Sequence, residues 1–312
     1  MRLQTSDIQR KLLNGSILLT GAPRSGTTLL GKLISTFKGI EYHFEPPSLY
    51  MIASSYVANT MPLDVAVNLL TIYLCEDLLL ESVHGRSVNL RPNDDSLVLN
   101  RMSWNNLNER WKTVSNRNDA ITMIQKQGLR LAVKMPNLFD SYNLMKSTLP
   151  NMYTVISVRN GVDVIRSIIC KGWVSRDGLS RDLWPYRGVE EGINIPYWVT
   201  DEYKKRWARM NQETRACLMW THHAELGLNV VTENQGLQIH KVRYEELLVN
   251  PLQIIDELAE ALGSETTFYT RKWIETVCIP KSMRERKMKD FITKIDADIR
   301  DRFEKINTKW GY

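Results

Sequence analysis

Short apolar runs alternate along the chain with segments whose apolar residues recur at helical spacing. The runs that predict buried strands are 16–20, 39–45, 129–134, 153–159 and 237–242. Helical spacing is found in 27–35, 163–170, 203–226 and 251–262. Because buried strands that alternate with helices are typical of a parallel sheet covered by helices, the sequence predicts the α/β class.

Two longer stretches interrupt this alternation. Residues 48–128 carry helical patterns, notably 64–80 and 104–111, and few strand patterns. We expect this stretch to be a mainly helical insertion packed against the sheet. Residues 172–198 are rich in Trp, Gly, Arg and Pro, and are predicted to form a long loop on the acceptor side. The whole chain, 1–312, is expected to be a single domain.

Composition narrows the class of protein. With 43% hydrophobic and 24% charged residues, the chain has the balance of an ordinary folded protein. The net charge of +6 suits anionic ligands but does not demand nucleic acid. The four cysteines form no CxxC pair, so neither a zinc cluster nor a disulfide framework is indicated. Residues 1–13 lack the apolar region of a signal peptide, and no run approaches the ~20 apolar residues of a membrane span. We expect a cytoplasmic protein, the alternative being the lumenal catalytic domain of a longer one.

A glycine-containing turn between the first strand and the first helix is the strongest chemical signal. Gly21-Ala22-Pro23-Arg24-Ser25-Gly26-Thr27-Thr28 has the spacing of a phosphate-binding loop, in which backbone N–H groups and a helix N-terminus surround an anion. Nucleoside triphosphatases carry a lysine at the position of Thr27, and here a cation stands at Arg24 instead. This difference favours a single 5′-side phosphate group over a triphosphate with magnesium.

Four segments of the chain resemble the sulfotransferases that use 3′-phosphoadenosine 5′-phosphosulfate (PAPS). Pro23 to Thr28 resembles their 5′-phosphosulfate loop. Val158 to Ser167 resembles their 3′-phosphate motif, with the strand-end Arg159 and the helical Ser167 at the two binding positions. The segments 242–251 and 309–312 resemble later landmarks of the family, so the resemblance spans nearly the whole chain.

The resemblance implies a donor and a set of binding residues. The donor is PAPS, the product is adenosine 3′,5′-bisphosphate (PAP), and no metal ion is required. The cofactor-binding residues implied are Pro23, Arg24, Ser25, Gly26, Thr27, Thr28, Arg159, Ser167 and, from a basic run near the C-terminus, Arg284 and Lys287.

Sulfuryl transfer needs positive charge near the moving group and a base for the acceptor proton. Arg24 and Lys134 are the candidates for the charge. Relatives that act on phenols and steroids carry a histidine shortly after the strand-end lysine, but here the chain reads Lys134-Met135-Pro136. Glu45 matches the Tyr-Glu-Pro segment of carbohydrate-acting relatives, and we therefore take Glu45 as the base. His43, which strand alternation places on the same face as Glu45, is the second candidate.

These features predict an enzyme that transfers a sulfuryl group from PAPS to a hydroxyl or amine of a small-molecule or glycan acceptor. The carbohydrate-type Glu45 favours a sugar, a glycolipid or a glycosylated natural product. Two alternatives remain open at this stage: a small-molecule kinase that uses ATP and magnesium, and a catalytically silent nucleotide-binding module.

Overall fold

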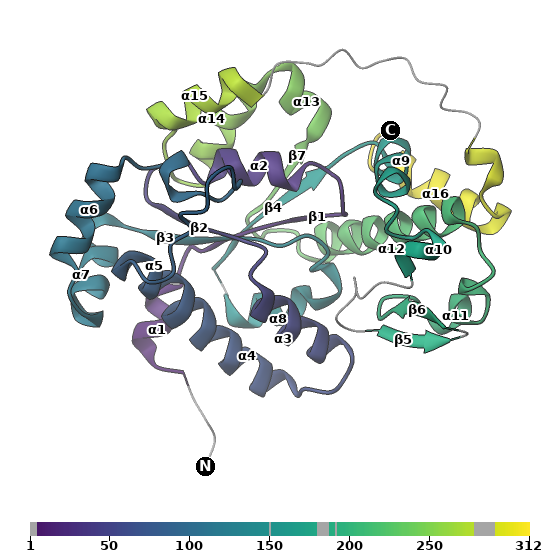
Figure 1. Cartoon of the computed structure of the whole chain (residues 1–312), viewed down its shortest axis with the longest axis horizontal. Helices are drawn as coiled ribbons and strands as arrows, with labels where there is room; N and C mark the ends of the chain where they lie inside the picture. The colour runs from purple at the N-terminus through teal and green to yellow at the C-terminus, as the bar shows by residue number, and fades with distance from the viewer. Residues whose placement is uncertain (1–4, 150, 180–186, 191, 278–290) are drawn as a thin grey trace.

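The computed structural model describes residues 5–149, 151–179, 187–190, 192–277 and 291–312. Its centre is a five-stranded sheet in the order β2-β3-β1-β4-β7, and every neighbouring pair is parallel (Figure 1). The α/β prediction is confirmed. The strands are β1 (Ile17–Gly21), β2 (Ile40–Phe44), β3 (Arg130–Lys134), β4 (Tyr153–Val158) and β7 (Ile239–Arg243).

The central strand β1 is buried along its whole length. Leu18 belongs to the apolar core on one face of the sheet, and Ile17 and Leu19 belong to the core on the other. A strand covered on both faces is apolar at every position rather than at alternate ones. This double burial explains the continuous apolar run in the sequence.

Helices cover both faces of the sheet (Figure 1). The smaller core lies under α2 (Thr27–Ile34), α13 (Tyr244–Val249), α14 (Pro251–Ala261) and α15 (Phe268–Val277). The larger core contains α1 (Asp7–Leu12), α3 (Pro47–Val57), α4 (Leu63–Ile72), α8 (Tyr142–Thr148), α9 (Gly161–Lys171), α12 (Gln212–Glu233) and α16 (Ala297–Lys309). No helix in the described ranges is long and apolar enough to cross a lipid bilayer.

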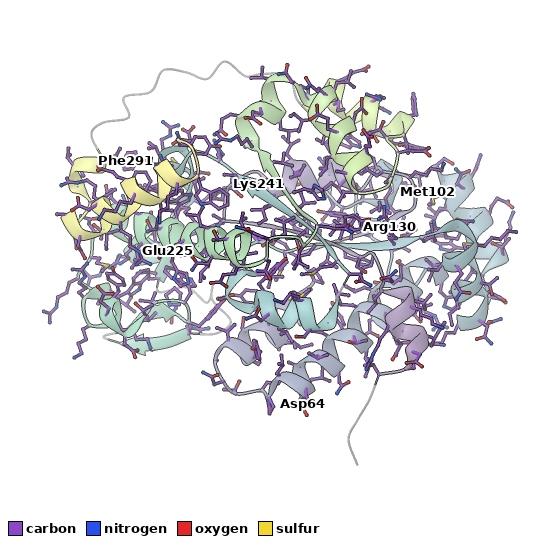
Figure 2. The ribbon with its side chains drawn as sticks, turned by 180° about the vertical axis from the view of Figure 1, so that it is seen from behind. Asp64, Met102, Arg130, Glu225, Lys241 and Phe291 are labelled. Carbon is purple, nitrogen blue, oxygen red and sulfur yellow. The ribbon has the colours of Figure 1, made fainter. Side chains whose placement is uncertain are left out.

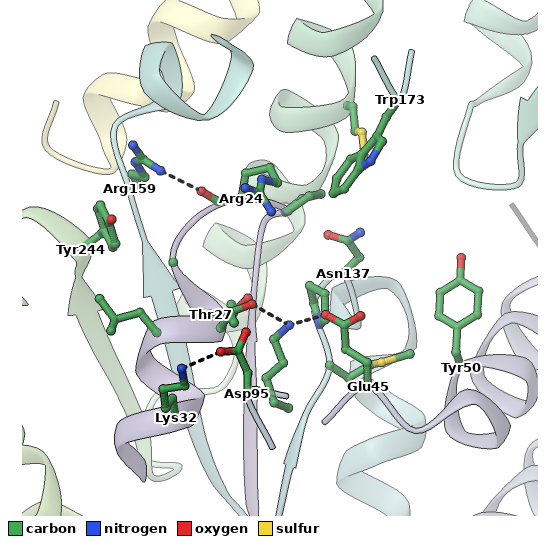
Figure 3. A pocket seen from close by; sticks show the side chains of 18 of the residues that line it. Arg24, Thr27, Lys32, Glu45, Tyr50, Asp95, Asn137, Arg159, Trp173 and Tyr244 are labelled. Carbon is green, nitrogen blue, oxygen red and sulfur yellow. Dashed lines mark hydrogen bonds and ion pairs between the residues drawn. The ribbon is translucent and has the colours of Figure 1, made fainter. Parts of the chain in front are cut away.

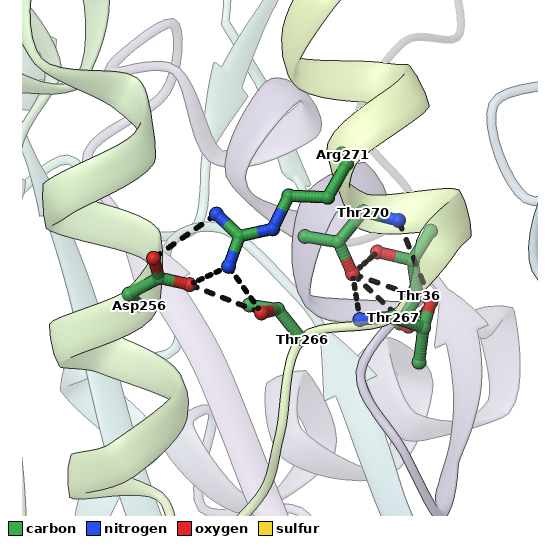
Figure 4. Close-up of polar contacts among 6 residues, drawn as sticks. All are labelled: Thr36, Asp256, Thr266, Thr267, Thr270 and Arg271. Carbon is green, nitrogen blue, oxygen red and sulfur yellow. Dashed lines mark hydrogen bonds and ion pairs between the residues drawn. The ribbon is translucent and has the colours of Figure 1, made fainter.

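Polar contacts fasten α15 to the end of α2 (Figure 4). Thr267 Oγ1 donates to the carbonyl of Thr36 over 2.8 Å, and the hydroxyl of Thr36 lies 2.9 Å from that of Thr270. Arg271 forms an ion pair of 2.9 Å with Asp256 of α14. The helix that begins at the phosphate loop is therefore held at its far end by the C-terminal part of the chain.

The stretch 48–128 is helical where the pattern predicts helices, but its middle departs from α geometry. The helix pattern over 64–80 is divided between α4 and a π-helix, η1 (Tyr73–Leu80). The remaining elements are α5 (Glu81–His84), a 3₁₀ turn η2 (Val98–Asn100), α6 (Trp104–Thr113) and α7 (Arg117–Gln127). Buried Glu41 of β2 joins this region to the sheet through ion pairs of 3.1 Å with Arg101 and 2.7 Å with Arg110.

The prediction of a long loop over 172–198 is wrong in part. The segment contains α10 (Arg176–Leu179) and an antiparallel hairpin of β5 (Arg187–Glu190) and β6 (Ile193–Pro196). Trp198, at the end of this segment, is 5% exposed and packs edge-on against Trp207, with the ring centres 5.6 Å apart. Burial of these aromatic rings stabilises the hairpin.

The helical pattern over 203–226 is divided into α11 (Asp201–Trp207) and α12. Helix α12 begins after Asn211, whose side chain accepts a hydrogen bond from Thr214 N and caps the helix. Figure 2 shows α12, marked by Glu225, beside the C-terminal α16. An ion pair between Glu225 and Arg302 links these two helices. Short 3₁₀ turns at η3 (Phe139–Ser141) and η4 (Ile292–Lys294) complete the described elements.

Candidate active site

A cavity of about 750 Å³ lies where β1, β3 and β4 end. After β1 the chain first adds β2 and β3 on one side of this strand and then β4 and β7 on the other. In open α/β sheets, the point where the strand order reverses in this way forms a crevice that binds ligands. The cavity wall includes the phosphate loop, the end of β3 and side chains from α2, α3 and the start of α13 (Figure 3).

The phosphate loop presents free backbone donors to the cavity. Gly26 is the N-cap of α2, with φ +99° and no side-chain cap. The first bond within the helix runs from Leu30 N to Gly26 O over 3.1 Å, so the N–H groups of Thr27 and Thr28 have no partner within the helix. Unpaired amides at the positive end of a helix favour a bound anion.

Glycine is required at two positions of this loop by close packing. A Cβ atom at Gly26 would stand 2.3 Å from the ring of Tyr244, and one at Gly21 would stand 2.6 Å from the carbonyl oxygen of Ser157. Ser157 also donates to Ser25 O over 2.8 Å, which fixes the loop against the end of β4. Tertiary contacts within the protein therefore hold the loop in place.

The two phosphate motifs meet at one cavity. Arg24, with φ +66°, donates from Nε to Ser167 Oγ over 3.1 Å. Arg159 donates to the carbonyl oxygen of Arg24 over 3.2 Å and lies 4.5 Å from the centre of the Tyr244 ring. Arg24 and Arg159 both line the cavity (Figure 3), and Ser167 adjoins it through its bond to Arg24. The structure thus brings together residues 143 positions apart in the sequence.

The opposite wall holds an ion pair between Lys134 and Glu45 (Figure 3). Lys134 is 1% exposed, and its Nζ atom also lies 3.4 Å from Thr28 Oγ1. Burial lowers the pKa of Lys134, and the neighbouring Glu45 carboxylate partly offsets this effect. Glu45 has φ +44°, and its N–H bonds Lys134 O over 2.8 Å. The left-handed backbone turns the carboxylate out of the line of β2 and toward the lysine.

His43, the second candidate base, does not line this cavity. It lies beside Glu41 and Arg101, and burial lowers its pKa to about 4. The strand-alternation argument fails because β2 ends at Phe44, so that Glu45 is no longer part of the strand. Two other predicted residues, Arg284 and Lys287, lie outside the described ranges.

Several cavity residues were not found from the sequence. Lys32 of α2 pairs with Asp95 over 2.6 Å, and Tyr50 projects from α3 beside Glu45 (Figure 3). Lys32 lies one helical turn beyond Thr28, so its position on the same face of the helix could have been predicted from the sequence. Nothing in the sequence places Asp95 or Tyr50, since both come from the helical stretch whose docking is tertiary. Tyr244 lies in the segment 242–251, which the sequence analysis gave no ligand-binding role, yet it lines the cavity beneath Arg159.

Comparison with known proteins identifies the family. A model described as the sulfotransferase family matches residues 16–267. The chain belongs to the sulfotransferase family. A sequence comparison of this sulfotransferase with functionally curated proteins gave no significant match.

One solved sulfotransferase domain shares the fold, and two others show a weaker similarity. The sulfotransferase domain from the curacin biosynthetic pathway is 16% identical with a TM-score of 0.51, covering 96% of this chain and 98% of its own. The domain from the Synechococcus PCC 7002 olefin synthase is 14% identical with a TM-score of 0.46, covering 95% and 94%. A sulfotransferase from Alicyclobacillus acidocaldarius is 14% identical with a TM-score of 0.45, covering 94% of each chain. At these identities the likeness concerns the fold alone.

Proposed function

We propose that this sulfotransferase moves a sulfuryl group from PAPS to a hydroxyl or amine of its acceptor. The observation that carries the proposal is the shared cavity of Arg24 and Arg159, with Ser167 joined to it by a hydrogen bond. A doubly phosphorylated adenosine presents two anionic groups, and guanidinium groups and helix-terminal amides are the donors such groups prefer. We assign the 5′ end to the loop at Gly26 and the 3′-phosphate to Arg159 and Ser167.

The reaction is an in-line displacement at sulfur. The acceptor oxygen forms a bond to sulfur while the bond from sulfur to the 5′-phosphate oxygen breaks, and PAP leaves. Glu45 takes the acceptor proton, since only one of its two carboxylate oxygens is bound to Lys134. Arg24 and Lys134 stabilise the negative charge that spreads over the sulfuryl and leaving oxygens.

For the acceptor we propose a hydroxyl group on a carbohydrate, a glycolipid or a glycosylated natural product. Glu45 occupies the position of the base in carbohydrate-acting relatives. The rings of Tyr50 and Trp173 both line the cavity, Tyr50 on the side of Glu45 and Trp173 beside Arg24, and they offer faces on which a sugar ring can stack (Figure 3). The kinase alternative is less well supported, because Thr27 stands in place of the lysine that contacts a triphosphate.

Calorimetric titration with PAP and with AMP tests the donor site. We expect PAP to bind at least about 10-fold more tightly, because the second phosphate adds charge-assisted hydrogen bonds. Incubation with radiolabelled PAPS and a panel of alcohols, phenols, amines and glycosides then identifies the acceptor by a mass gain of one sulfuryl group. Equal affinity for AMP and PAP, or magnesium-dependent ATP turnover, would contradict the proposal.

A further inference from the structure

Left-handed backbone at non-glycine residues is concentrated in the wall of the active-site cavity. Five non-glycine residues of the described chain have a positive φ, and three of them, Arg24, Glu45 and Asn137, line this cavity. Such conformations are strained for most side chains, and they cluster where a site needs a particular geometry. Arg24 and Glu45 already have proposed roles in the reaction. Asn137, with φ +64°, has none.

Asn137 lies where the two halves of the site meet. Its backbone N–H bonds Gly21 O over 3.1 Å, which holds it against the start of the phosphate loop. It comes three residues after Lys134, the partner of Glu45. In the view of Figure 3, its side chain lies between Trp173 and Glu45. A sulfuryl group that moves from the phosphate loop toward Glu45, as proposed above, travels along this part of the wall.

The side-chain amide of Asn137 is available to a ligand. Its Oδ1 atom is enclosed by protein and has no hydrogen-bond partner. The Nδ2 atom has no partner among the described residues either, but it is not enclosed, so its two N–H groups are open to a molecule in the cavity. The reverse orientation of the amide would enclose two unpaired N–H donors in place of one unpaired oxygen, and it is therefore the less favourable one.

Backbone geometry alone does not explain an asparagine at this position. Glycine adopts a positive φ without strain, and it would avoid the free-energy cost of an enclosed, unpaired oxygen. The amide must therefore contribute something that the backbone does not. A neutral N–H donor in the same wall as the cations Arg24 and Lys134 suits an oxygen atom that carries partial negative charge.

We propose that Asn137 Nδ2 donates a hydrogen bond to an oxygen atom of the sulfuryl group, which makes Asn137 a further catalytic residue. The inference rests on the proposed function. Arg24 and Lys134 supply charge to the moving group, and Asn137 sets its orientation, with sulfur in line between the leaving oxygen and the acceptor oxygen. PAPS makes this bond and PAP does not, because PAP lacks the sulfuryl group.

Calorimetric titration with PAPS and with PAP tests this contact without any acceptor. Asn137→Gly keeps the left-handed backbone and removes the amide. We expect it to raise the Kd of PAPS about 10-fold, the effect of one lost hydrogen bond to an anion, and to leave the Kd of PAP within about 2-fold. Asn137→Asp keeps the shape but replaces the donor with a carboxylate, so it should weaken PAPS binding further. Asn59→Gly, the same exchange at φ +56° outside the cavity wall, is the matched control.

The outcomes separate this contact from the function on which it rests. An unchanged Kd of PAPS in Asn137→Gly, or equal losses with PAPS and PAP, overturns the contact with the sulfuryl group. A loss of PAPS affinity in Asn59→Gly as large as that in Asn137→Gly overturns it as well, because the effect would then come from the backbone exchange. A wild-type protein that binds neither PAPS nor PAP contradicts the donor site itself.

Discussion

Arg24 Nε donates a hydrogen bond to Ser167 Oγ over 3.1 Å and so connects the phosphate loop to α9. The cation is also placed by Trp173, whose ring centre lies 5.7 Å from the Arg24 guanidinium carbon. Contacts within the protein thereby join the loop and the helix, which reduces the ordering that nucleotide binding would otherwise require.

This relationship predicts unequal effects of two substitutions on PAP affinity. Arg24→Ala removes a charge-assisted donor and should cost about 2–3 kcal/mol, which is roughly 30- to 150-fold in Kd. Ser167→Ala removes a neutral hydroxyl and should cost about 1 kcal/mol, near 5-fold. Calorimetric titration with PAP measures both. Arg209→Ala removes a cation that lies outside this cavity wall, so it should leave the Kd for PAP unchanged. A loss of PAP affinity equal to that of Arg24→Ala would show a general effect of charge.

Gly26→Ala should abolish nucleotide binding because of a clash as well as backbone strain. The added methyl group would stand 2.3 Å from the Tyr244 ring, at a residue with φ +99°. Gly236→Ala is the matched control, since Gly236 has φ +94° with nothing within 4 Å of the added methyl group. We expect strain alone to cost about 1–2 kcal/mol of unfolding free energy in the control. Urea unfolding and PAP titration should show a larger loss of stability and loss of binding only in Gly26→Ala; identical behaviour of the two variants would rule out the clash.

Glu45→Gln should reduce kcat with the identified acceptor by about 10²- to 10⁴-fold, the usual contribution of a general base. The affinity for PAP should remain within about 3-fold, because Glu45 lies on the acceptor side of Lys134. Asp95→Asn is the control, since Asp95 is another carboxylate in the cavity wall but pairs with Lys32. Steady-state kinetics of both variants separate the two carboxylates. If only Asp95→Asn lost turnover, Glu45 would not be the base, and retained binding with lost turnover in Glu45→Gln would exclude a catalytically silent module.

Lys134 should give the activity an alkaline limit. Burial lowers its pKa below the usual 10.5, so Lys134 loses its proton at a lower pH than an exposed lysine does. If its ammonium group stabilises the moving sulfuryl group, kcat falls as the pH rises through the lowered pKa. Lys134→Arg keeps its charge over this range and should extend activity to higher pH, at reduced kcat because the fork-shaped group fits the buried site poorly. Coincident pH profiles for wild type and variant would assign the limit to another group.

The phosphate loop and the strands beside it were predictable because their signals are local. Ile17, Leu18 and Leu19 follow one another without a polar residue because both faces of the strand are covered, and Gly21 and Gly26 mark a turn that side chains would block. The spacing of Arg159 and Ser167 on a strand end and the following helix carries the same kind of information. The error over 172–198 has a different origin: its two short strands stabilise each other and are packed by Trp198 and Trp207, and no local pattern reports that pairing.

The sequence by itself determined the α/β class, the loop at Gly26 and the residues that we propose as phosphate ligands, since turn chemistry and apolar periodicity act over a few neighbouring residues. Only the tertiary structure decided which of these residues face one another. It turned Glu45 toward Lys134 and left His43 beside Glu41, and it paired Lys32 of α2 with Asp95 in the cavity wall. Such contacts join residues far apart in the chain, and they depend on the way helices dock on the sheet.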